Sequence, residues 1–345
     1  MRKNILKAIC LTTAIVASAA TTTAKAQNSF QNKRELVLSV LDQSKPNDYV
    51  PAAFFLHFDN KLGAKAVQDH IDFIRATNMD IVKIQYEIVV PHIDITSPED
   101  FKKVPVYQAD FFEPQLSVIE DLANEFKDQL LIFPTVYSPL MLLYQTGGQG
   151  VIEVIKQDPS AAEVALANLS ASLINFIGAA RERGADGFYI STQGGSEEVF
   201  GGVDGYNKIA RPYDKALSEF ANEIAPINIL HICGYTGNYS NVEGYVDYPA
   251  SIINPPFYVG EEGAGDFSKL QDVFHRPIFG GLNRLGAINK GTLEEAKAEV
   301  DEVFRNAPTN FILGANCTVP SDTDYDQIRA IIDYAHNWRK THRSK

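Results

Sequence analysis

Cysteine, basic charge and long apolar runs are all scarce in this chain, and each shortage excludes a class of protein. Three cysteines among 345 residues are too few for a fold built on disulfides. No continuous apolar run approaches the roughly 18 residues that a membrane helix needs, so we expect no membrane span. Acidic residues outnumber Lys and Arg by 43 to 31, for a formal net charge of −12. Because nucleic-acid phosphates bind to basic surfaces, we expect no nucleic-acid partner either.

The composition that remains is that of an ordinary globular protein. Hydrophobic residues make up 45% of the chain and charged residues 21%, which is enough for a sizeable core. The sequence contains no linker rich in Pro or Ser, no low-complexity tract and no internal repeat. This length and composition suit one large α/β domain, which we place at residues 27–345.

The first 26 residues have the organisation of an export signal. Three basic side chains lie within the first seven residues, and a short, mostly apolar stretch follows over 8–20. Ala24 and Ala26 then offer small residues at the −3 and −1 positions of a cleavage site before Gln27. We therefore expect residues 1–26 to be a cleaved signal peptide and the mature protein to be periplasmic or secreted.

Along the rest of the chain, short β-rich runs alternate with amphipathic stretches, the pattern of a parallel sheet wrapped by helices. The clearest expected helices are 64–77, 115–127, 151–183, 213–224, 292–304 and 325–340. The expected strands are 51–58, 79–87, 130–137, 187–192, 227–233, 251–254, 277–283 and 310–317.

Eight such units over about 300 residues predict an α/β fold, a single (β/α)8 TIM barrel. The alternative is a doubly wound open sheet. It is weakened because no Gly-rich turn after the first strand is followed by an acidic residue about 20 positions on. The segments that follow strands are long, as at 196–206 and 257–267. A barrel carries its active site on such loops, at the carboxyl ends of its strands.

Three potential metal ligands stand at these strand ends. His231 and Cys233 end the fifth expected strand, and Cys317 ends the eighth. Side chains at i and i+2 of a strand point to the same face, so His231 and Cys233 face the same way. Imidazole and thiolate are favoured zinc ligands, and the three residues together predict a zinc site at the mouth of the barrel.

Two other fates of the cysteines remain open at this point. Both could be buried thiols without a ligand, as free cysteines usually are, or they could form a disulfide in an oxidising compartment. Geometry argues against the disulfide. Strands three steps apart in a barrel are separated by on the order of 10 Å, whereas a disulfide needs Cα atoms within about 7 Å. Removal of residues 1–26 also removes Cys10 and leaves only these two cysteines.

Several segments resemble the uroporphyrinogen decarboxylase superfamily, a barrel family that includes zinc-dependent methyltransferases serving corrinoid proteins. In residues 84–91 an acidic side chain stands before an apolar pair and a proline, which is similar to the family's second strand. The H-x-C tripeptide with a distant cysteine resembles the zinc motif of the methyltransferase branch. The other similar segments are 138–148, 184–186 and 281–283.

This resemblance implies roles for particular residues. It implies that the three ligands hold zinc, and that Tyr144 is the counterpart of the decarboxylases' active-site tyrosine. Glu87 stands at the position of the family's acidic residue, where it could be a general base or a fourth zinc ligand. A salt bridge between Glu87 and Lys83 is an equally good interpretation. The expected substrate-binding residues, all near strand ends, are His57, Thr192 and Asn283.

The sequence departs from the decarboxylases where they bind substrate carboxylates. Their arginine-rich segment corresponds here to residues 54–60, which contain no arginine, so a porphyrinogen would lack its charge partners. We therefore expect methyl transfer to a zinc-activated thiol, with a small-molecule thiol or a corrinoid as the reaction partner. The alternatives are a carboxy-lyase that uses Glu87 and Tyr144 on a carboxylated ring, and an exported binding protein without catalysis.

Overall fold

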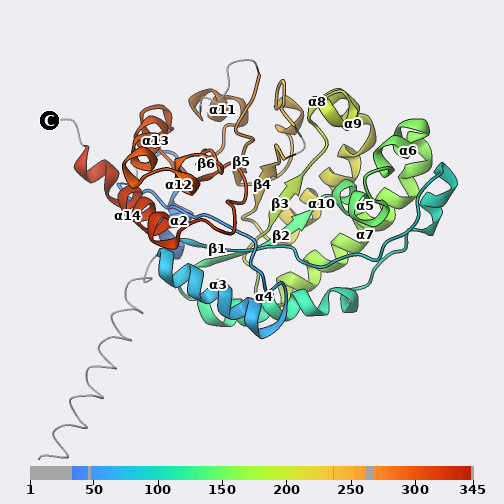
Figure 1. Ribbon diagram of the computed structural model, residues 1–345, viewed down its shortest axis with the longest axis horizontal. Coiled ribbons are helices and arrows are strands. Elements are labelled where there is room, and N and C mark those ends of the chain that lie inside the picture. Colours follow the sequence, from blue (N-terminus) through green and yellow to red (C-terminus); the bar gives the residue numbers. More distant parts are fainter. Residues whose placement is uncertain (1–32, 46–47, 236, 261–266, 343–345) are drawn as a thin grey trace, which may run out of the picture.

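The structure is a computed structural model that describes residues 33–45, 48–235, 237–260 and 267–342 (Figure 1). The expected signal peptide over residues 1–26, together with Cys10, lies outside these described residues. Its presence and cleavage therefore stay predictions.

Seven parallel strands form one sheet, and each strand pairs with the next one in the sequence. This order is that of a TIM-barrel-like α/β fold, and it excludes a doubly wound sheet, whose strand order reverses at a switch point. All but one of the strand residues are buried, as expected for a sheet covered by helices. The strands are β1 (Ile81–Ile84), β2 (Leu131–Tyr137), β3 (Tyr189–Thr192), β4 (Ile229–Ile232), β5 (Ile252–Asn254), β6 (Ile278–Leu282) and β7 (Phe311–Ala315).

The first predicted strand, residues 51–58, differs from the prediction. It forms one isolated bridge, between Ala52 and Leu313 of β7. On its other side the Ala52 N–H donates to the Asp80 carboxylate at 2.7 Å, and the Asp80 N–H donates to the Ala52 carbonyl at 3.0 Å. The Asp80 carboxylate thus accepts the hydrogen bond that a backbone carbonyl would accept in a regular strand. The ladder of backbone hydrogen bonds therefore does not continue from residues 51–58 to β1.

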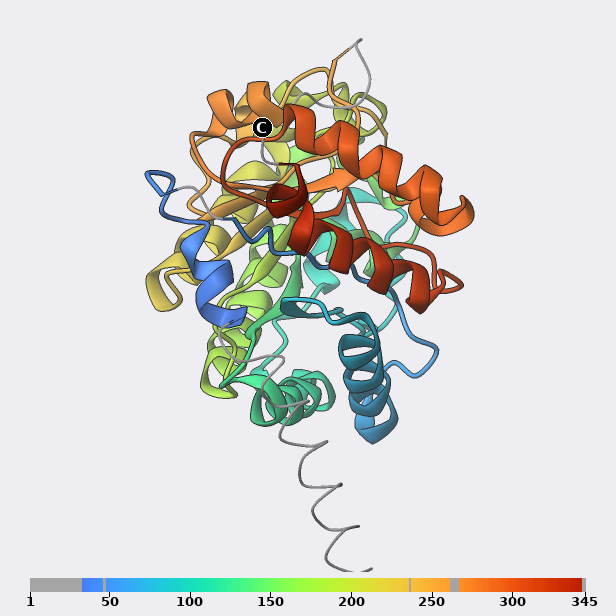
Figure 2. The same cartoon turned by 90° about the vertical axis from the view of Figure 1, so that its left-hand side faces the viewer.

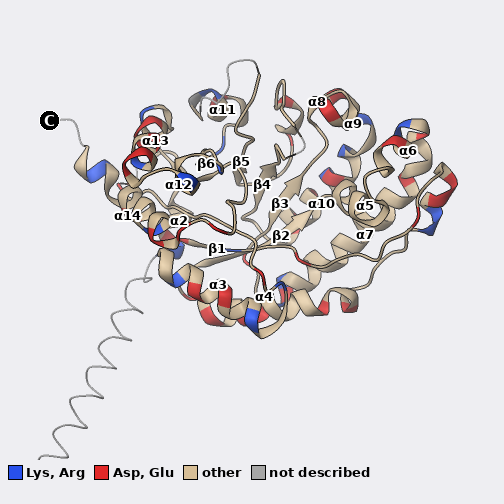
Figure 3. Cartoon of the chain, viewed as in Figure 1, with Lys and Arg blue, Asp and Glu red and all other residues tan. Residues whose placement is uncertain are grey.

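Helices follow the strands and surround the sheet (Figure 1). Figure 2 shows α14 between α3 and α13, so the C-terminal helix covers the junction between the first and last strands. Charged side chains are carried mainly by these outer helices (Figure 3). The α-helices are α2 (Lys33–Ser39), α3 (Gly63–Thr77), α4 (Glu113–Phe126), α5 (Pro139–Gly147), α6 (Val151–Gln157), α7 (Pro159–Glu182), α8 (Glu197–Phe200), α9 (Val203–Ile209), α10 (Arg211–Ile224), α11 (Phe267–Phe274), α12 (Ala287–Lys290), α13 (Leu293–Asn306) and α14 (Tyr325–Thr341), and the 3₁₀ helices are η1 (Pro98–Lys103), η2 (Ala109–Phe112) and η3 (Glu243–Tyr245).

The helix expected over residues 151–183 is two helices, α6 and α7. The chain breaks at Asp158, because Pro159 has no N–H to continue the first helix. The Asp158 carboxylate then accepts a hydrogen bond from the Ala161 N–H at 3.1 Å and caps the new helix.

By length and composition α7 could cross a membrane, contrary to the expectation that no stretch is apolar enough. Half of its most apolar continuous stretch of 18 residues is buried inside the fold. The helix packs against α5 and α10, which is how a core helix of a barrel uses its apolar side chains.

Candidate functional site

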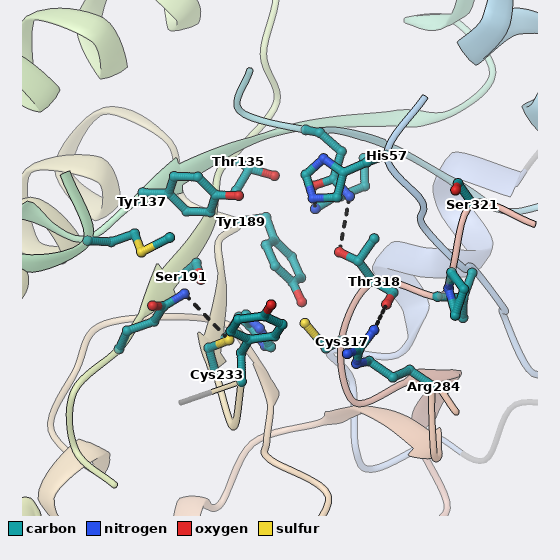
Figure 4. A pocket seen from close by; sticks show the side chains of 18 residues that line it. His57, Thr135, Tyr137, Tyr189, Ser191, Cys233, Arg284, Cys317, Thr318 and Ser321 are labelled. Atoms are coloured by element: carbon teal, nitrogen blue, oxygen red, sulfur yellow. Dashed lines mark hydrogen bonds between the residues drawn. The ribbon is translucent and has the colours of Figure 1, made fainter. Parts of the chain in front are cut away.

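A cavity of about 450 Å³ lies where the strands end at their carboxyl side (Figure 4). Alternate side chains of a strand share a face, and the cavity is lined accordingly: residues 83 and 85 lie in β1 and just after it, and residues 231 and 233 lie in β4 and just after it. None of the lining residues is an Asp or a Glu. They are His57, Lys83, Gln85, Thr135, Tyr137, Met141, Tyr189, Ser191, Gln193, His231, Cys233, Tyr235, Arg284, Cys317, Thr318, Val319, Pro320 and Ser321.

The structure brings the three predicted metal ligands together. His231 lies in β4, Cys233 directly after it, and Cys317 two residues after β7. One ring nitrogen of His231 and the two sulfur atoms all lie within 4.8 Å of one another. Both cysteines are free thiols, and their sulfurs face each other across the floor of the cavity (Figure 4). This group could hold a metal ion.

The pKa values of the two thiols are shifted in opposite directions. The pKa of the Cys317 thiol lies well below its usual range, mainly because of its hydrogen bond with Cys233. His231 lowers this pKa further, and burial acts in the opposite direction. Hydrogen bonding to Cys317 together with burial raises the pKa of the Cys233 thiol well above its usual range. Each sulfur therefore influences the protonation of the other, as expected for two thiols in contact.

Surrounding residues hold this group in place. The amide of Gln193 donates to Cys233 Sγ at 3.7 Å, and the Tyr239 hydroxyl donates to the Cys233 carbonyl at 3.0 Å. The Tyr189 ring stacks on the His231 ring with centroids 5.1 Å apart. The buried Nδ1 of His231 has no hydrogen-bond partner among the described residues. An unpaired buried nitrogen costs free energy, which a bound ligand at the ring can offset.

Lys83 lies in the same cavity, with only 7% of its surface exposed. Its Nζ donates to the Gln85 side chain and lies over two aromatic rings, 5.0 Å from the centroid of Phe55 and 4.7 Å from that of Tyr189. Burial lowers the pKa of Lys83 to about 7, although Cys317 and Glu87 act to raise it. The cavity therefore contains a buried amine that titrates near neutral pH.

Glu87 does not line the cavity. His57 Nδ1 lies 2.6 Å from Glu87 Oε1, and Lys61 Nζ lies 3.6 Å from the same oxygen. Glu87 is thus paired with His57 and Lys61. Among the described residues it forms no salt bridge with Lys83, the partner suggested by the sequence. His57 itself lines the cavity, as expected.

The other three predicted residues lie near the cavity without lining it. Tyr144 lies in α5 and lines a smaller, mostly apolar pocket, which shares Met141, Gln193 and Tyr235 with the main cavity. The Thr192 hydroxyl donates to the His231 carbonyl at 3.1 Å, on the face of β3 opposite to Ser191. The Asn283 side chain accepts from the Leu285 N–H at 2.9 Å and forms a local turn.

The sequence interpretation overlooked several lining residues. Lys83, Gln85 and Ser191 follow from the i, i+2 alternation within the expected strands 79–87 and 187–192, and Gln193 continues that alternation one residue beyond the second of them. Arg284 lies two residues after the end of β6. The sequence interpretation instead predicts its neighbour Asn283 as a substrate-binding residue. Applying the alternation rule to every strand would have identified the first four.

Comparison with known proteins supports the resemblance predicted from the sequence. A profile of the family Uroporphyrinogen decarboxylase (URO-D) matches residues 74–338. Two relatives, both described as methylcobamide:CoM methyltransferase MtbA, come from Methanosarcina mazei and Methanosarcina acetivorans. Each is 23% identical over 257 residues, which cover 74% of this chain and 73% of the relative. A solved methyltransferase from Methanosarcina mazei has the same fold, with a TM-score of 0.73 at 16% identity, and the match covers 90% of this chain and 99% of that one.

Proposed function

Because the chain belongs to the uroporphyrinogen decarboxylase family, we propose that it is a zinc-dependent methyltransferase that transfers a methyl group to the sulfur of a small thiol. The observation that carries the proposal is the group of His231, Cys233 and Cys317 within 4.8 Å of one another, facing a cavity large enough for a small molecule. The methyltransferase relatives support the same class of reaction.

The donor set fits zinc. Two sulfurs and one imidazole are a usual set for a catalytic zinc, which keeps a fourth position open for substrate. Bonds of about 2.0–2.3 Å in a tetrahedron place ligand atoms roughly 3.3–3.8 Å apart. The three atoms here, all within 4.8 Å, need only small side-chain movements to reach that geometry. A soft donor set of this kind does not suit calcium or magnesium.

The roles of the chain's own residues follow from their positions. Zinc held by these residues would act as a Lewis acid and lower the pKa of the substrate thiol, so that its nucleophilic thiolate form predominates at neutral pH. Gln193 and Tyr239 fix Cys233, and Tyr189 fixes the His231 ring. The methyl group forms a bond with the sulfur while its bond to the donor breaks, and the electron pair of that bond leaves with the donor.

Methyl transfer can be measured with methylcobalamin as donor and CoM as acceptor, since the relatives' description names a methylcobamide and CoM. We expect the zinc-loaded protein to consume methylcobalamin and form methylated CoM. His231→Ala should lower the rate by on the order of 100-fold or more, because it removes one of three ligands. His92→Ala is the matched control, since His92 is exposed and outside the cavity. An equal rate in the H231A and H92A proteins would contradict the proposal.

The carboxy-lyase alternative has less support from the site. Its acid, Glu87, is held by His57 and Lys61 and does not line the cavity. Its tyrosine, Tyr144, belongs to the neighbouring pocket. Turnover of a carboxylated substrate that Glu87→Gln abolishes would favour this alternative, and a protein without turnover of either kind would favour a binding function.

We also propose that the protein acts outside the cytoplasm, on the evidence of its first 26 residues alone. The purified exported protein should begin near Gln27 on N-terminal sequencing. Ala26→Gln should block cleavage, because signal peptidases need a small residue at this position. Lys25→Gln is the control, since the residue between the two small positions of the cleavage site is not restricted in size. Intact Met1 in the exported protein would contradict this proposal.

A further inference from the structure

We propose that Lys83 is a nucleophilic amine that forms an imine with a small aldehyde or ketone bound in the cavity. This covalent chemistry goes beyond the proposed methyl transfer and does not depend on it. It needs no metal, and its reacting atom belongs to β1, a strand that carries none of the three potential ligands.

The contacts of Lys83 favour its neutral amine over its ammonium form. Only 7% of its surface is exposed, and its Nζ donates to the uncharged amide of Gln85. Among the described residues no carboxylate forms a salt bridge with it, and Glu87 is paired with His57 and Lys61. Burying an ammonium without a carboxylate is costly. The lowered pKa of about 7 agrees with these contacts, and the neutral amine is the nucleophilic form of a lysine.

The surroundings of Lys83 suit the product as well as the amine. Lys83 lines the cavity of about 450 Å³, which has room for a small carbonyl compound. Its Nζ lies over two aromatic rings, 5.0 Å from the centroid of Phe55 and 4.7 Å from that of Tyr189. A protonated imine is a cation, and the faces of aromatic rings stabilise cations.

Two further side chains can serve the carbonyl oxygen. Thr135 lines the cavity from β2, two residues beyond Phe133, the register partner of Lys83, so it shares a face of the sheet with Lys83. The buried Thr135 Oγ1 has no hydrogen-bond partner among the described residues and can donate to this oxygen. His57 also lines the cavity, and Glu87 holds its Nδ1 at 2.6 Å. An imidazole oriented by a carboxylate is a usual group for proton transfer.

The reaction is a condensation that needs no further reactant. The lone pair of Nζ forms a bond with the carbonyl carbon, and the π electron pair of the C=O bond moves to the oxygen. The oxygen takes up a proton that the nitrogen loses, which gives a carbinolamine. Its hydroxyl then leaves with the second proton of the nitrogen as water, and the C=N bond forms. One amine and one carbonyl compound thus give one imine and one water.

The test traps the imine in the purified full chain. Propionaldehyde at a limiting concentration and sodium cyanoborohydride are added at pH 7, and the propyl adducts are located by peptide mass spectrometry. At this pH an amine whose pKa is about 7 is half unprotonated, whereas a lysine in water is less than about 0.1% unprotonated. A less basic nucleophile is intrinsically weaker, as is known for thiols. We therefore expect Lys83 to be labelled on the order of 100-fold faster than the exposed Lys290.

Two controls separate nucleophilicity from simple access. Lys83→Met should remove the fast adduct and leave the labelling of Lys290 unchanged. At pH 10, where about 30% of a lysine in water is unprotonated, the preference for Lys83 should nearly disappear.

Three results would overturn the inference. One is labelling of Lys83 no faster than that of Lys290 in the wild type, which does not depend on the folding of any variant. The others are a fast adduct at another lysine that persists in the K83M protein, and a preference that is unchanged at pH 10. None of them bears on methyl transfer, which the H231A protein tests separately.

Discussion

The Cys317→Ser protein is expected to keep its fold and to lose nearly all of its zinc. Cys317 is one of the three grouped ligands, and a zinc-bound cysteine is a thiolate, so serine removes both a ligand and its negative charge. A hydroxyl is a poor zinc ligand at neutral pH, and one imidazole with one thiol should hold the metal far more weakly. Metal analysis of the purified protein should find about one zinc per chain in the wild type and a small fraction of that in C317S.

Met141→Leu is the matched control for this experiment. Met141 also places a sulfur in the cavity, but it is not one of the three grouped ligands, so the zinc content should not change. Wild-type protein that contains no zinc and shows no free thiol until it is reduced would mean a Cys233–Cys317 disulfide. Protein without zinc whose two thiols react only after unfolding would mean that they have no ligand. Either result would contradict the zinc site.

Asp80→Ala is expected to lower the free energy of unfolding by about 3–5 kcal/mol, the cost of breaking a buried charge pair. Asp80 is fully buried and lies 3.0 Å from Lys33 Nζ and 2.7 Å from His336 Nε2. It also accepts hydrogen bonds from the Tyr49 hydroxyl and the Ala52 N–H. The substitution thus removes a carboxylate that holds α2, α14 and residues 49–52 against β1. Chemical denaturation monitored by circular dichroism measures the loss.

The pH dependence of this effect has a defined sign. Burial alone would raise the pKa of the Asp80 carboxyl, but hydrogen bonding to His336 and the charge of Lys33 hold it below its usual value. Its contribution to stability is therefore complete above the unfolded pKa of about 3.9 and is lost as the pH falls through the lower folded value. The stability difference between wild type and D80A should shrink only in that acid range.

Asp322→Ala provides the comparison for Asp80, because Asp322 forms an exposed ion pair with Lys290. We expect this variant to lose no more than about 1 kcal/mol, since solvent screens the pair. Similar losses of stability in D80A and D322A would contradict the assignment of Asp80 as a buried anchor.

The fold was predictable to the extent that local pattern controls it. The strand at 227–233 and the helix at 292–304 follow from runs of β-branched residues and from apolar periodicity, and both are present as β4 and α13. The break at Asp158 could have been predicted from Pro159 alone. The end of the regular ladder at Ala52 could not, because it depends on the Asp80 side chain accepting the Ala52 N–H, a contact between segments 28 residues apart.

In the candidate site, too, features set by local sequence pattern were predictable and features set by tertiary contacts were not. His231 and Cys233 could be assigned to one face because they belong to a single strand, and the shared mouth of a barrel suggested their meeting with Cys317. The pairing of Glu87 with His57 was not predictable, because it joins two segments whose relative depth only tertiary packing decides. The apparent partner of Glu87 in the sequence, Lys83, points into the cavity instead.

The junction at Ala52 also bears on the order in which the protein acquires its structure. Ala53 N–H donates to the Leu313 carbonyl, so the beginning of the domain is completed by its last strand, β7. Contacts between segments so far apart in the chain form late, because the entropy of closing the loop must first be overcome. Cys317 follows the same strand. Any state of the chain in which β7 is not in place would have two metal ligands without the third, so coordination by all three residues requires β7 to have joined the sheet.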